Sequence, residues 1–97
     1  MTTYPNATTL KLPATLLQAQ AQSIADGLVD VLGKVLRPGS LAVIDASDLS
    51  HFDSSALAVL LTCQRVSASA GGTLLISGLP ERARNLAAVY GVSALFA

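Results

Sequence analysis

The sequence predicts one α/β domain with a mixed, partly parallel β-sheet and helices packed on it. Compact aliphatic runs alternate with longer amphipathic stretches, in the order strand, helix, strand, helix, strand, helix. This alternation is typical of strand–helix–strand units with right-handed crossovers. The length of 97 residues fits a single domain, and 52% hydrophobic against 12% charged residues supply ample apolar material for one core.

The first part of the chain predicts one strand and one long helix. Polar and apolar residues alternate over residues 8–12, and Pro13 ends the run, as in a short edge strand. From Leu16 to Leu36 apolar residues recur at helical spacing while polar positions lie four residues apart. An amphipathic helix is therefore expected there, closed by the Pro38-Gly39 turn.

A central strand and a second helix are expected next. The aliphatic run over residues 41–44 is apolar on both faces, as in the central strand of a sheet that helices cover. Residues 45–53 predict a loop with one brief extended piece. The helix that follows is expected over residues 54–69, capped by Asp53 or Ser54.

The last strand–helix pair is bounded by glycines. An aliphatic run over residues 73–77 predicts a strand after the Gly71-Gly72 pair. A final helix is expected from about Glu81 to Tyr90, with Pro80 at its first position and Gly91 at its end.

Charge and composition exclude several classes of function. Six basic and six acidic side chains cancel, so the chain lacks the positive surface of a nucleic-acid-binding protein and no nucleic-acid partner is expected. Cys63 and His51 are the single residues of their types, which gives no disulfide and no zinc ligand set. Neither a metal nor another cofactor is expected.

The expected location is the cytoplasm. The start of the chain lacks a basic stretch followed by an apolar one, so no secretory signal is predicted. The longest uninterrupted apolar run, residues 56–61, is far shorter than the roughly 18 residues of a spanning helix. No direct insertion into a membrane is expected, and any association with a membrane would require a partner protein.

The most informative stretch is residues 49–57, a loop that brings two hydroxyl groups into the first turn of a helix. The free amides and positive dipole end there would stabilise a phosphate on Ser54 or Ser55, whereas Asp53 would repel it. A simpler interpretation is that all three residues are helix caps. The composition leaves both interpretations open.

The helix over residues 54–69 carries more apolar residues than one buried face requires. Its other side is small, flat and weakly polar, since residues at spacings of three and four share one face. Such a surface allows close approach of a partner helix, and an ordinary solvent-exposed face has the same composition. The candidate partner-binding residues on that side are Ser54, Ser55, Ala58, Thr62 and Arg65.

A hydrolytic site would have to combine His51, Asp53 and Ser54 or Ser55, because the chain has no other histidine. Nothing resembles the Gly-x-Ser-x-Gly nucleophile elbow. Proximity in sequence does not supply the geometry of a catalytic triad, so the chain is not expected to be an enzyme.

Residues 8–96 resemble the STAS domain family, named after sulfate transporters and anti-sigma factor antagonists. The resemblance rests on the run Leu41–Asp45, on the motif Asp53-Ser54-Ser55-Ala56-Leu57, and on the stretch from Gly72 to Leu79, with Ala56 in place of the usual glycine. It implies a docking module without catalytic activity. The STAS domain would then comprise residues 8–97, and residues 1–7 are expected to be a flexible tail.

Two branches of this family place the key hydroxyl differently. The resemblance to anti-sigma factor antagonists implies that a partner kinase phosphorylates Ser55. The resemblance to the STAS subunit of Mla-type phospholipid-transport ABC complexes implies that Ser54 lies near the ATPase subunit. A phosphate at either position would add negative charge to the docking face and weaken the contact.

The end of the chain favours the transport branch. Residues 85–92, including Tyr90, resemble the closing helix of the Mla-type subunit. The partners implied are an ABC transporter ATPase at the cytoplasmic face of the inner membrane and, through it, the permease of a complex that maintains outer-membrane lipid asymmetry. The alternative partner is an anti-sigma kinase.

Overall fold

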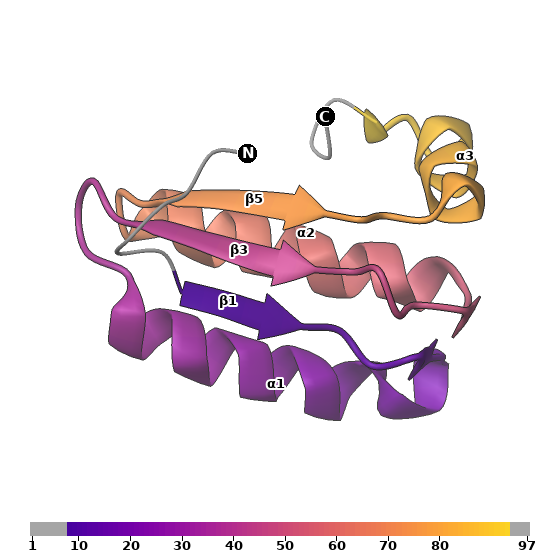
Figure 1. The fold of residues 1–97 in the computed structure, drawn as a ribbon, viewed down its shortest axis with the longest axis horizontal. Helices are drawn as coiled ribbons and strands as arrows, with labels where there is room; N and C mark the ends of the chain where they lie inside the picture. Colours follow the sequence, from indigo (N-terminus) through magenta and orange to yellow (C-terminus); the bar gives the residue numbers. More distant parts are fainter. Residues whose placement is uncertain (1–7, 94–97) are drawn as a thin grey trace.

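The computed structural model describes residues 8–93, so the predicted tail at residues 1–7 lies outside the described part of the chain. The described residues form eight elements, and Figure 1 shows how the longer ones are arranged. They are β1 (Thr8–Lys11), β2 (Thr15–Leu16), α1 (Gln18–Val35), β3 (Leu41–Asp45), β4 (His51–Phe52), α2 (Ser54–Ser69), β5 (Thr73–Ser77) and α3 (Glu81–Val89).

Three strands form the main sheet in the order β1-β3-β5, and β2 pairs with β4 beside it. The predicted edge strand and the predicted central strand are both confirmed, with Ala42 and Ile44 of β3 fully buried. Every strand pair within residues 8–93 is parallel, whereas the sequence predicted a mixed sheet. The α/β class is confirmed, because each parallel pair requires a crossover connection.

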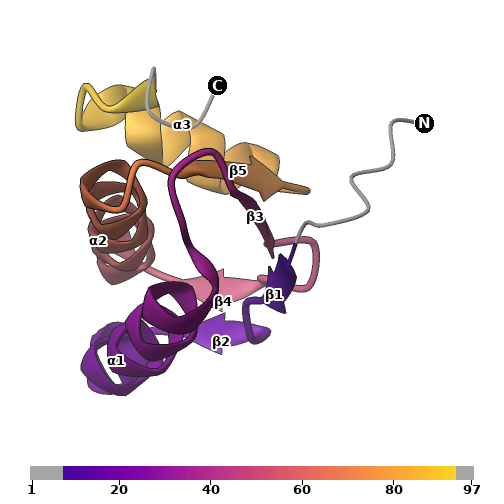
Figure 2. The same cartoon turned by 90° about the vertical axis from the view of Figure 1, so that its left-hand side faces the viewer.

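Both long helices cover the same face of the main sheet. Figure 2 shows α1 and α2 side by side on one face, with α3 past the end of β5 and next to α2. Leu32 of α1 and Leu60 of α2 are fully buried in the core between them and the sheet. On the opposite face Leu41 and Val43 of β3 are only half-buried, so helices cover less of the sheet than the aliphatic run predicted.

The boundaries differ from the sequence prediction mainly at the start of α1. The helix was expected from Leu16 but begins at Gln18, because Leu16 belongs to the two-residue strand β2 and is fully buried there. The strand β2 was not predicted from the sequence. The brief extended piece expected before α2 is β4, and α2 and β5 have the predicted bounds.

A glycine turn fixes the path from β5 into α3. Gly78 has a φ of +68°, in the left-handed region that side chains disfavour. A Cβ at Gly78 would lie 2.9 Å from the Cβ of Ser47, which follows β3. Both the backbone conformation and the close approach therefore require glycine, and the position of α3 depends on this turn.

Replacing Gly78 by alanine is expected to lower the free energy of unfolding by about 1–3 kcal/mol, because the new methyl is strained and meets Ser47. The matched control is Gly33→Ala in α1, where a Cβ meets nothing within 4 Å. That change should stabilise the domain by about 0.5–1 kcal/mol. Urea unfolding measures both, and equal effects of the two variants would contradict this account of the turn.

Candidate docking surface

Asp53 joins the starts of the two long helices. Its Oδ1 accepts a hydrogen bond of 2.8 Å from the Ser55 amide in α2, and its Oδ2 accepts one of 3.3 Å from the Gln18 amide in α1. Of the two caps that the sequence predicted, Asp53 or Ser54, Asp53 is the N-cap of α2, and its contact with the start of α1 was not predicted. The hydrogen bond from the Ser55 backbone amide lowers the pKa of the Asp53 carboxyl, and the opposing effect of burial is smaller.

The two candidate serines lie in different surroundings. Ser54 is exposed at the surface, whereas Ser55 is half-buried. The Ser55 hydroxyl also contributes to the lowered pKa of the Asp53 carboxyl. Of the two hydroxyls, Ser54 is the one presented to an approaching protein.

The rest of the predicted small face lies at the surface of α2. Ala58 and Arg65 are exposed and Thr62 is half-buried. The Thr62 hydroxyl donates to the Ala58 carbonyl at 3.0 Å, so its polar atom is satisfied within the helix. The face therefore presents mainly methyl groups, with one cationic side chain at its far end.

A groove runs between α2 and α3, next to this face. It consists of two adjoining depressions of about 480 Å³ and about 310 Å³. We call it the α2–α3 groove. Phe52, Asp53, Arg82, Asn85, Leu86 and Val89 line the larger depression, Leu57, Ala58, Leu61 and Val92 line the smaller one, and Ser54 and Tyr90 line both.

The α3 side of the groove exposes large apolar side chains. Val89 is 81% exposed and Tyr90 is 59% exposed. The helix buries Ala83 and Ala87, four residues apart, against the core. The contribution of α3 to this surface was not predicted, although the spacing of these alanines indicates that Val89 and Tyr90 lie off the buried face.

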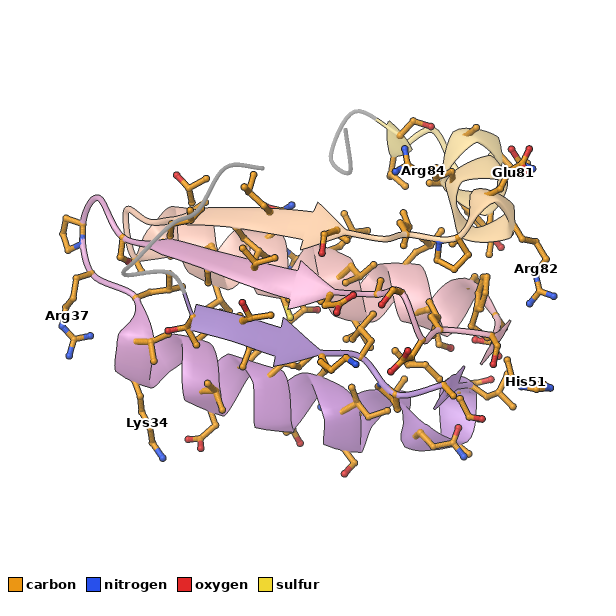
Figure 3. The ribbon with its side chains drawn as sticks, in the orientation of Figure 1. Lys34, Arg37, His51, Glu81, Arg82 and Arg84 are labelled. Atoms are coloured by element: carbon orange, nitrogen blue, oxygen red, sulfur yellow. The ribbon has the colours of Figure 1, made fainter. Side chains whose placement is uncertain are left out.

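The residues considered for catalysis do not form a nucleophilic site. His51 is exposed, its Nδ1 lies 3.2 Å from the Ser50 Oγ, and Figure 3 shows it pointing away from the domain. The His51 ring makes this contact rather than one with Ser54 or Ser55.

Cys63 is buried in the core. Burial raises the pKa of its thiol to about 11, which keeps it protonated at neutral pH.

The part of the chain that the structure describes also offers no metal site. Across residues 8–93, no group of three or more His, Cys, Asp or Glu side chains is placed to hold an ion. None of the helices in this range is long and apolar enough to cross a membrane.

The sequence model of the family described as "Mlab, STAS domain" matches residues 3–97. The chain belongs to the MlaB-type STAS domain family. Its fold is similar to the crystal structure of a sulfate transporter family protein from Wolinella succinogenes, with a TM-score of 0.76, 15% identity, and coverage of 100% of this chain and 76% of that one. At that identity the likeness shows the fold alone. A search of curated proteins found no match.

The role of Asp53 in this STAS domain predicts a pH-dependent stability. Because folding lowers the pKa of the carboxyl below its ordinary value of 3.8, the ionised group stabilises the fold above that pH. The stabilisation is lost as pH falls through the lower folded value. Asp53→Ala should therefore reduce Tm at pH 7, and its difference from the unaltered chain should shrink below pH 3.8.

Thermal unfolding followed by circular dichroism over this pH range tests the prediction. Asp26→Ala is the control, since Asp26 accepts a bond from Gln22 on the exposed side of α1 and lies away from the helix starts. The control should change Tm little at any pH. If the Tm of Asp53→Ala stays below that of the unaltered chain by the same amount at every pH, the ionised Asp53 carboxylate does not stabilise the fold as described.

Proposed function

We propose that this STAS domain is a non-catalytic subunit that docks on the cytoplasmic ATPase of an Mla-type ABC phospholipid transporter and stabilises or activates it. The observation that carries the proposal is the apolar surface of the α2–α3 groove, where Val89 is 81% exposed and Tyr90 is 59% exposed beside the small face of α2. Contiguous exposed apolar surface marks a site of protein–protein contact. Membership of the MlaB-type family supports an ABC transporter as the assembly.

The docking surface combines the α2–α3 groove with the face of Ser54, Ser55, Ala58, Thr62 and Arg65. Small side chains on α2 let a partner helix approach closely, while the groove accepts a larger apolar side chain. Their contiguity follows from Ser54 and Ala58, which belong to both. A single partner segment can therefore contact the face and the groove together.

The proposed mechanism requires no chemistry in the STAS domain. If the domain binds one conformation of the ATPase more tightly, it shifts the population toward that conformation by its difference in affinity. ATP hydrolysis can then be regulated without contact between the domain and nucleotide. The domain would reach the cytoplasmic face of the inner membrane through the ATPase and the permease.

The surroundings of the serines favour the transport function over the partner-switching one. Ser54 is exposed and lines the groove, whereas Ser55 is half-buried and lines neither depression. Of the two hydroxyls, the one that the transport branch uses is thus the one that lines the groove. Phosphorylation of Ser54 would add negative charge inside the groove and should weaken docking.

A bulky substitution on the small face tests the proposal. Ala58→Trp should weaken binding to the purified transporter ATPase at least tenfold, because the indole blocks the approach of a partner helix. A tenfold loss corresponds to about 1.4 kcal/mol. Isothermal titration calorimetry measures the affinity, and circular dichroism verifies that the variant is folded.

Ala68→Trp is the matched control, since Ala68 is also exposed on α2 but lies outside the groove. It should leave the affinity within about twofold, as surface changes away from a contact usually do. Equal losses in the two variants would count against this docking surface. Binding to an anti-sigma kinase instead, with release on phosphorylation of Ser55, would establish the alternative function.

A further inference from the structure

Arg82 stands at the wall of the α2–α3 groove in a fixed orientation. Its guanidinium carbon lies 4.3 Å from the centre of the Phe52 ring, and its Nη2 donates to the Phe52 carbonyl at 3.1 Å. Stacking on an aromatic face and a hydrogen bond together hold the guanidinium in place. The side chain lines the larger depression together with Ser54 and Tyr90.

Most of the hydrogen-bonding capacity of Arg82 remains available. A guanidinium has five N–H donors, and the bond to the Phe52 carbonyl uses one of them. The ion pairs between described residues are Lys11–Asp48 and Lys34–Asp30, neither of which involves Arg82. In Figure 3 the Glu81 and Arg82 side chains leave the start of α3 in different directions.

Asp53 is the other charged residue that lines the groove, and its carboxylate caps the two long helices. Both of its oxygens accept backbone amide bonds, from Ser55 and from Gln18. Arg82 is the cationic side chain of the groove and has N–H donors free for a partner, beside apolar surface from Leu86 and Val89. A cation next to an apolar wall is complementary to a partner segment that carries an acidic residue beside an apolar one.

We infer that Arg82 selects the docking segment by pairing with a carboxylate of the ATPase, while an adjacent apolar side chain of that segment enters the groove beside Tyr90. This inference rests on the proposed function, because it names the chemistry of the same docking surface. The planar guanidinium, held by Phe52, can bind a carboxylate through two parallel hydrogen bonds. Docking excludes water from the pair and so strengthens it relative to an exposed ion pair.

The test compares the affinities of the unaltered domain, Arg82→Gln and Arg84→Gln for the purified transporter ATPase at low and at high salt. Arg84 is the matched control, since it lies two residues away on α3, donates to the Leu79 carbonyl and does not line the groove. Arg82→Gln should lose about tenfold or more in affinity at low salt and much of the salt dependence. Arg84→Gln should retain both.

The salt dependence separates recognition from a purely structural role, because Arg82 also ties α3 to β4. A structural loss would lower affinity by the same factor at every salt concentration. Arg82→Lys adds a second readout, since it keeps the charge but loses the planar fork and should recover only part of the affinity.

Two outcomes would overturn the inference in distinguishable ways. Binding of the unaltered domain with no difference between Arg82→Gln and Arg84→Gln would remove the role of Arg82 and leave the proposed function intact. Absence of any binding between the unaltered domain and the ATPase would remove the proposed function and this inference with it.

Discussion

The arrangement of the candidate site depends on one carboxylate between two helix starts. Free amides at both N-termini need acceptors, and the positive dipole ends favour a negative charge. Asp53 meets both needs, because it accepts hydrogen bonds from the amides of Ser55 and Gln18. Gln18 lies 35 residues before Asp53 in the sequence. Since α1 and α2 cover the same face of the sheet, this contact aligns their ends and directs the first turn of α2 to the surface.

The groove beside that turn results from the short last helix. Gly78 turns the chain away from β5, and α3 then fully buries only the two small residues Ala83 and Ala87, while Leu86 packs partly buried against the core. Small contact residues leave the larger Val89 and Tyr90 uncovered near the start of α2. The structure thus leaves apolar surface next to a small, weakly polar helix face, a combination suited to binding another protein.

The sequence predicted the elements with strong local signals. The bounds of α2 and β5 were predicted correctly, because a cap at Asp53 and glycines beside both elements define them. The strand β2 was missed, since two residues carry no periodicity and their pairing with β4 is a tertiary contact. The α2 face was predicted because residues at helical spacing share one side of a helix. Arg82 was not predicted, because its place beside Phe52 is a tertiary contact that depends on how α3 packs.

Hydrogen–deuterium exchange of the domain, alone and bound to the transporter ATPase, tests the central claim most directly. The account predicts slower exchange on binding in the first turns of α2 and in α3, where Ser54 and Tyr90 line the groove. Backbone amides of β1 and of the exposed side of α1 should be unchanged. Protection confined to α1 or to the main sheet, with none in α2 or α3, would contradict docking through the groove.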